Sequence, residues 1–117
     1  MTSEAFRKLA LSFAHAEERA HMHHPDFRVD TKIFATMGYP RPGWAMVTLT
    51  PDEQAAFVRM EPEIFVPVKG KWGEQGCTNI ILAQATRPPV RAALKTAYER
   101  AARAPSARGR KHRGRAA

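Results

Sequence analysis

The sequence predicts an α+β fold of two layers, in which helices cover one face of an antiparallel sheet. Two observations predict it. Stretches with helical apolar spacing lie at the start, middle and end of the chain, and short alternating stretches lie between them. The alternating stretches are close together in sequence, which favours an antiparallel meander. The expected order is α-β-β-β-α-β-β-α, within residues 1–104.

The first helix is expected from about residue 3 to residue 15. Thr2 or Ser3 can cap its start. The i, i+3, i+4, i+7 spacing of one buried helical face is seen in Phe6, Leu9, Ala10 and Phe13.

Strands are expected next. Residues 19–24 and 27–29 alternate, and residues 32–37 and 44–49 also have strand character. The glycines and prolines of residues 38–43 indicate a turn between the last two.

The second helix has the clearest local signal in the chain. Thr50 can cap it, Pro51 suits its first position and Glu53 can close a capping box. We expect it to end near Met60, before Pro62, and to bury Ala56, Phe57 and Met60.

The second half of the chain predicts two strands and a last helix. Residues 65–68 form a short extended segment at a sheet edge or bulge, because Pro67 cannot donate to a ladder. Residues 70–76 form a glycine-rich loop and residues 78–83 a strand. A helix opened by Pro88 or Pro89 then runs to about residue 104 and turns inward Val90, Leu94, Ala97 and Ala101.

Length and composition limit the function classes. The 117 residues fit one domain, and no apolar run is long enough to span a membrane. The N-terminus lacks the pattern of a secretory signal. Cys77 is the only cysteine, so no internal disulfide can form, and cytoplasm is the expected location.

Most of the net charge of +8 belongs to the end of the chain. Residues 1–103 carry 14 Lys and Arg against 11 Asp and Glu, a net of +3, and residues 104–117 carry five cations and no acid. We therefore expect residues 105–117 to be a basic disordered tail, with the cations Arg108, Arg110, Lys111, Arg113 and Arg115.

The tail suits phosphate contact, which gives affinity without sequence readout. Two alternatives remain open. Arg outnumbers Lys 13 to 6, as a GC-rich coding sequence produces, so the tail can also be compositional drift or a solubilising segment. The other alternative is contact with an acidic protein or a membrane surface, although no apolar anchor accompanies the charge.

His21 and His23 alternate on an expected strand, so their rings are predicted to face one side. With His24, Asp26 and Asp30 nearby, they are the most enzyme-like feature of the sequence. A metal site needs more ligands than this pattern secures, so we predict no metal. A half-exposed polar strand face and a nucleic-acid surface are the other interpretations.

The glycine-rich loop matches neither a phosphate loop nor a dinucleotide fingerprint, and we predict no cofactor. Lys69, Lys71 and Trp72 combine cations with an aromatic ring, which can grip a nucleic-acid backbone and stack a base. The favoured alternative is that Trp72 folds back onto the core.

Three cations, Arg87, Arg91 and Lys95, recur every four residues on the last helix. The ordinary interpretation is a solvated face. The more specific interpretation is a face that contacts a nucleic-acid backbone and continues into the tail. Arg28 joins the same candidate nucleic-acid surface.

Cys77 has no clear activating partner, and no catalytic residues are predicted.

Several segments together resemble the MmcQ/YjbR family. They follow one another at family-like spacing over about residues 3–104, and they are HMHHPDFRV at 21–29, KIFAT at 32–36, GWAMV at 43–47, LTPDEQ at 49–54, PEIF at 62–65, GKWG at 70–73 and GCTN at 76–79. The resemblance implies an α-β-β-β-α-β-β-α fold similar to secretion chaperones and frataxin-like proteins. It also implies a DNA-binding label, with a double-wing motif, and no catalytic residues.

The leading hypothesis is thus a non-enzymatic nucleic-acid-binding protein, with DNA as the favoured partner, low sequence preference and strong salt dependence. A protein-interaction scaffold, possible as a homodimer, is the first alternative, and it predicts an exposed apolar patch. Metal or small-molecule binding through the histidine strand is the second.

Overall fold

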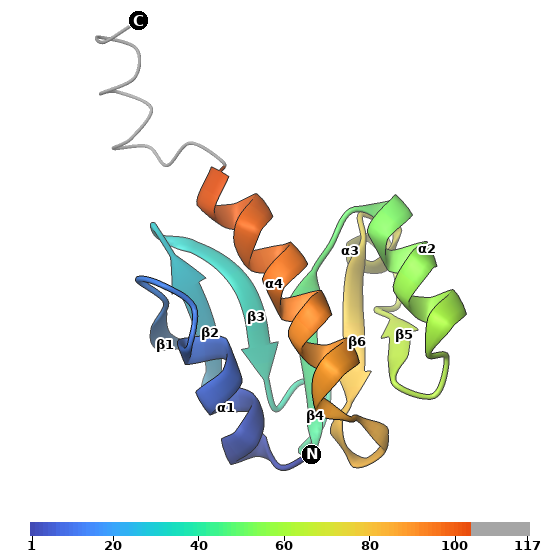
Figure 1. Cartoon of the computed structure of the whole chain (residues 1–117), viewed down its shortest axis with the longest axis horizontal. Coiled ribbons are helices and arrows are strands. Elements are labelled where there is room, and N and C mark those ends of the chain that lie inside the picture. Colours follow the sequence, from blue (N-terminus) through green and yellow to red (C-terminus); the bar gives the residue numbers. More distant parts are fainter. Residues whose placement is uncertain (104–117) are drawn as a thin grey trace, which may run out of the picture.

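The computed structural model describes residues 1–103 of the chain. Within them, the elements in chain order are α1 (Ser3–Leu11), β1 (Glu17–His21), β2 (His24–Val29), β3 (Lys32–Met37), β4 (Trp44–Thr48), α2 (Pro51–Met60), β5 (Phe65–Pro67), α3 (Lys71–Glu74), β6 (Cys77–Ile81), the 3₁₀ turn η1 (Leu82–Gln84) and α4 (Arg87–Arg103). The strands form one antiparallel sheet in the order β1-β2-β3-β4-β6-β5. Helices α1, α4 and α2 cover one face of it (Figure 1), which confirms the predicted fold class.

The first predicted strand region is a hairpin rather than one strand. Strands β1 and β2 pair directly, with His21 opposite His24. The two residues between them, Met22 and His23, have φ of 50° and 69°. Positive φ at both central positions is what a tight two-residue hairpin turn requires. The chain therefore has four strands before α2 in place of the expected three, and His23 is a turn residue.

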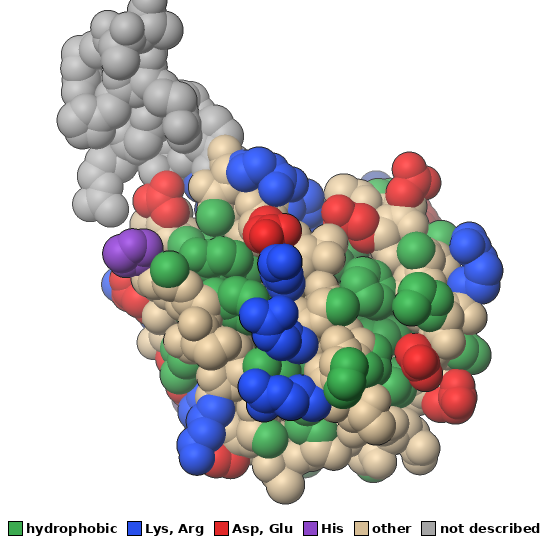
Figure 2. Space-filling model, in the orientation of Figure 1, with side chains coloured by type: hydrophobic (Ala, Val, Ile, Leu, Met, Phe, Trp, Pro, Cys, Tyr) green, Lys and Arg blue, Asp and Glu red, His purple; other side chains and the backbone are tan. Residues whose placement is uncertain are grey.

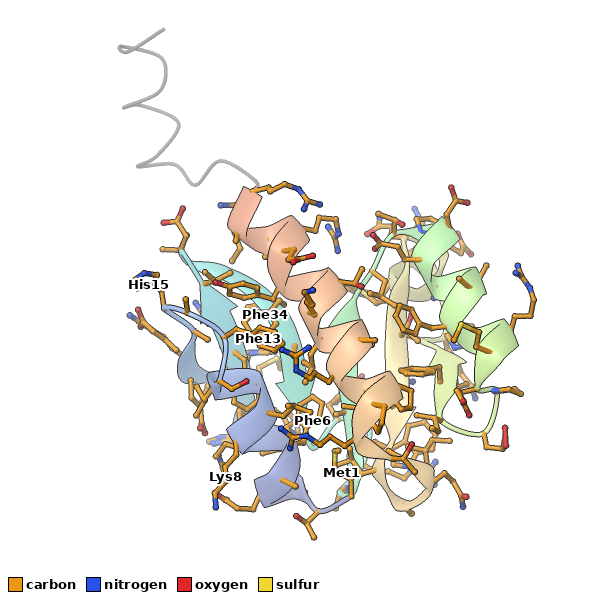
Figure 3. The ribbon with its side chains drawn as sticks, in the orientation of Figure 1. Met1, Phe6, Lys8, Phe13, His15 and Phe34 are labelled. Carbon is orange, nitrogen blue, oxygen red and sulfur yellow. The ribbon has the colours of Figure 1, made fainter. Side chains whose placement is uncertain are left out.

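Helix α1 is shorter than predicted, ending at Leu11, although its Thr2 cap is confirmed by the Ala5 N–H donating to Thr2 Oγ1 at 3.0 Å. Phe13 follows the helical spacing but lies beyond the helix end. It still packs inward, because its ring stacks on Tyr98 at 4.9 Å and meets the edge of Phe34 at 6.5 Å between centroids (Figure 3).

Helix α2 begins as predicted but buries less than expected. The capping box is present, with the Thr50 N–H donating to Glu53 Oε1 at 2.9 Å and the Glu53 N–H donating to Thr50 Oγ1 at 3.2 Å. None of its residues is fully buried, and the Met60 side chain is 68% exposed. Phe57 makes the main anchor, with its ring centroid 5.2 Å from that of Phe65. The helix lies at the sheet's β5 end, so it has little neighbouring surface to pack against (Figure 1).

The core lies between the sheet and helices α1 and α4. Helix α4 turns inward the predicted apolar positions and also Ala93. The large side chains fully buried in the layer between sheet and helices include Phe6, Phe27, Phe34, Ile80 and Leu94. In β3, Phe34 and Ala35 are both buried, because the pairing of β2 with β3 shifts register beside them.

The end of the sheet beyond β6 follows the prediction for Pro67. Strand β5 is an edge strand, and Pro67 belongs to it. Strand β6 ends at Ile81, two residues before the predicted end, and η1 follows.

Within residues 1–103, no helix combines the length and apolar character needed to cross a membrane.

Candidate functional site on the open face of the sheet

Within residues 1–103, helices α1, α2 and α4 all lie on one side of the sheet (Figure 1), and we call the other side the open face. Strand alternation and register decide which side chains it presents. Thr36 pairs with Met46, and Thr48 with Cys77, so these side chains point to one side, while their neighbours Ala35, Val47 and Ile80 join the core on the other. Figure 1 views the molecule from the helical side, so the open face is turned away from the reader.

The open face is hollowed into a groove of about 590 Å³, which we call the sheet groove. Its floor comes from the sheet, and its rim comes from three connections: the β1–β2 turn, the β3–β4 loop and the segment around α3. The residues that line it are His21, Met22, His24, Ile33, Thr36, Tyr39, Met46, Thr48, Val68, Lys69, Trp72 and Cys77. A hollow of this volume lies in the range of small-molecule sites.

Three large apolar side chains are exposed at the rim: Met22 is 83% exposed, Tyr39 54% and Trp72 68%. Such side chains are ordinarily at least partly covered in a protein surface. Their concentration around one hollow makes this face the candidate binding surface of the described residues.

Trp72 does not fold back onto the core, so that expectation is wrong. Residues 71–74 form the single helical turn α3, and within it Gly73 faces the body of the protein. A Cβ atom at Gly73 would lie 1.6 Å from the Val68 carbonyl oxygen, so the two backbones are in direct contact. Gln54 reinforces this contact by donating to the Gly73 carbonyl at 3.1 Å and to the Cys77 carbonyl at 2.9 Å. With Gly73 turned inward, its neighbour Trp72 is turned to solvent.

His21 is held in place by Asp26. Its Nδ1 lies 2.6 Å from Asp26 Oδ2, and Arg28 donates to the same carboxylate from Nε at 2.7 Å and from Nη2 at 3.1 Å. The Asp26 side chain is fully buried. Burial by itself raises the pKa of this carboxyl, but the hydrogen bonds from Arg28 and His21 outweigh it and the pKa lies below its usual value. The carboxylate thus orients the His21 ring through Nδ1, and His21 also lines the sheet groove.

The predicted pairing of His21 and His23 on one strand face is wrong. His21 ends β1 and lines the sheet groove, whereas His23 occupies the turn and is not in the lining. The physical reason is the tight hairpin, whose left-handed turn residues break the alternation. His24 takes the place expected for His23, and its ring meets the edge of Tyr39 at 5.5 Å.

Only some of the predicted basic residues lie at the groove. Lys69 lines it, and Lys71 is exposed beside Trp72. Arg28 lies on the same face, but its guanidinium is paired with Asp26. The predicted cations of the tail, Arg108, Arg110, Lys111, Arg113 and Arg115, lie outside the described residues.

The basic stripe of α4 is on the helical side. Figure 2 shows Lys and Arg side chains in a column along this helix. Arg91 lies over the Phe13 ring at 5.7 Å, Lys95 Nζ is 4.0 Å from Glu99 Oε2, and Arg87 is exposed. The fold therefore does not bring these three cations to the face that carries Lys69 and Trp72.

The Cys77 thiol, in the lining of the sheet groove, is not activated for nucleophilic attack. Cys77 is 7% exposed, and burial raises the pKa of its thiol against the opposing effect of the Arg100 charge. A thiol in this state is a poor nucleophile. Within residues 1–103, no three His, Cys, Asp or Glu side chains are grouped so that they could hold a metal ion.

The sequence prediction missed most of the lining. The pairing of Thr36, Met46 and Thr48 on one face follows from strand alternation and could have been found by writing out the register. Tyr39 and Met22 could not, because they belong to turns whose direction depends on the folded sheet.

The sequence profile of the YjbR family matches residues 11–100. This chain belongs to the YjbR family. The match is slightly narrower than the resemblance over residues 3–104, and it contains the complete lining of the sheet groove. The basic residues from 104 onward lie outside the YjbR match. Curated proteins include no significant match to this YjbR-family chain.

Proposed function

We propose that this YjbR-family chain is a non-enzymatic nucleic-acid-binding protein that holds its ligand on the open face of the sheet, with low sequence specificity. The observation that carries the proposal is the composition of the sheet groove. Among the described residues, its lining contains a lysine, two histidines and two exposed aromatic rings, and no Asp or Glu. Cations with aromatic rings on a hollow surface are the combination that grips a nucleic-acid strand.

The charge of the chain supports the same function. The groove itself supplies Lys69, with Lys71 next to it, and the last 14 residues add five cations without an acid. Contacts of this kind act on phosphates, so they give affinity without reading sequence. DNA is the favoured ligand because the family resemblance carries that label.

A titration at two salt concentrations tests the proposal. We expect the full chain to bind DNA at about 50 mM salt and to lose most of that affinity at about 200 mM, because phosphate contacts release counterions. Duplex and single-stranded DNA are measured in parallel by fluorescence anisotropy. Absence of binding at low salt, or an affinity that ignores salt, contradicts the proposal.

A protein partner is the second candidate, and the apolar character of the groove favours it. Met22, Tyr39 and Trp72 form an exposed apolar rim around a floor that contains Ile33 and Met46. A second copy of the chain that covered this rim would bury apolar surface and leave a salt-independent complex. A mass in solution that rises with protein concentration at high salt would favour this candidate.

A further inference from the structure

The sheet groove, with exposed aromatic rings at its rim, suits a ligand with a free ring face better than a double helix. It is a hollow of about 590 Å³ bordered by the β1–β2 turn on one side and by α3 on the other. A duplex keeps its bases stacked and presents only its backbone and base edges, whereas an unpaired base exposes a ring face. The exposed rings of Trp72 and Tyr39 have no partner to stack on in a duplex.

The fold fixes the backbone that carries Trp72 and gives the Tyr39 ring a neighbouring ring. Trp72 is held outward by the backbone contact of Gly73 with Val68. Tyr39 is supported by His24, whose ring meets it edge-on at 5.5 Å. A platform whose backbone is fixed in advance loses less conformational freedom when a base stacks on it.

The floor of the groove adds a hydrogen-bonding position. His21 is turned by its contact with Asp26, so its Nε2 is the polar ring atom left toward the groove. With Nδ1 engaged by the carboxylate, Nε2 is the ring nitrogen that can hydrogen-bond the edge of a base. Lys69 at the rim is a cation for the phosphate that follows the base.

We infer that the sheet groove holds an unpaired base of a single-stranded nucleic acid, stacked on Trp72 and Tyr39, with His21 at its edge and Lys69 at its phosphate. The inference rests on the proposed function and deepens it, because it names the form of nucleic acid that the site selects. The absence of carboxylates from the described lining supports a phosphate-bearing occupant over a cationic one.

The experiment compares three probes of equal length at low salt: a single strand, the matching duplex, and a single strand whose central nucleotides are abasic. We expect the single strand to bind more tightly than both others. Trp72→Ala is expected to weaken binding of the single strand about 5- to 150-fold and to leave the duplex and abasic affinities unchanged. Trp72→Phe is expected to keep most of the affinity, since its ring still stacks.

Met60→Ala is the matched control, because Met60 is as exposed as Trp72 and lies on α2. It should bind all three probes like the unaltered chain, and circular dichroism confirms that each variant is folded. Equal affinity for single strand, duplex and abasic strand, with no effect of Trp72→Ala, overturns the inference and leaves the proposed function standing. No binding to any probe at low salt overturns both.

Discussion

The Asp26 carboxylate is charged and fully buried, and it is hydrogen-bonded to two side chains, Arg28 and His21. Arg28 gives the carboxylate two of its hydrogen bonds, at 2.7 and 3.1 Å, and His21 gives it one at 2.6 Å. A buried charge is stable only when such partners replace water. The arrangement therefore makes the position of the His21 ring depend on the same carboxylate that Arg28 neutralises.

Removing Arg28 tests this dependence. We expect Arg28→Ala to lower the free energy of unfolding by about 1–3 kcal/mol, because it leaves a buried carboxylate short of hydrogen bonds. Urea denaturation monitored by circular dichroism measures the change.

Arg19 provides the control, since it lies opposite Asp26 in the register of β1 with β2 but its ion pair among residues 1–103 is with Glu17, at 3.5 Å. Both of those side chains are more than half exposed, so Arg19→Ala should change stability by less than about 0.5 kcal/mol. Equal effects of the two substitutions would falsify the assignment of a structural role to Arg28.

At the scale of the element, the single turn of α3 forms one side of the sheet groove and carries Trp72. Its place is set by two glycines that allow backbones to touch. Cβ atoms added at Gly73 and Gly76 would meet the carbonyl oxygens of Val68 and Leu49 at 1.6 and 2.0 Å. A glycine-rich loop in the sequence is thus a packed wall in the fold.

Gly73→Ala should displace α3. The added methyl group meets the Val68 backbone, whose N–H donates to the Cys77 carbonyl, so we expect a loss of about 1–3 kcal/mol in stability. Thermal and urea unfolding measure it. Glu74→Ala, an exposed change in the same turn, is expected to alter stability by less than about 0.5 kcal/mol, and an equal loss in both variants contradicts this account.

At the scale of the whole molecule, the charge of the protein is divided between its parts. Residues 1–103 have a net charge of +3, while the last 14 residues contribute +5. On the described part, the cations of α4 and those beside the groove lie on opposite faces of the sheet. A single strand held at the groove therefore meets Lys69 and Lys71, whereas the α4 stripe lies on the other face of the sheet.

Deletion of residues 105–117 should flatten the salt dependence of duplex binding by about four to five units in the slope of log affinity against log salt, because five cations are removed. Anisotropy titrations over a series of salt concentrations measure the slope. A full-length variant with its five tail cations changed to Gln separates charge from chain length, and it should behave like the deletion. An unchanged slope in either variant places the phosphate contacts on the body of the protein.

Local patterns in the sequence determined the fold class and most element positions. The Thr50–Glu53 capping box, the edge position of Pro67 and the inward face of α4 each depend on residues within a few positions of one another, so physical rules of short range predict them. The same rules failed at Met22 and His23, where the left-handed turn of a hairpin interrupts the alternation.

Only the tertiary structure decided the site. The groove joins residues that are far apart in sequence, from His21 on β1 to Cys77 on β6, and strand pairing alone makes them neighbours. The direction of Trp72 depends on a contact between Gly73 and Val68 that no pattern of residue types records. The sequence by itself determined that Lys69, Lys71 and Trp72 share a loop and that the tail is basic. Whether those side chains meet His21 across one face was decided by the register of the sheet, because a shift of one residue exchanges the two faces of a strand.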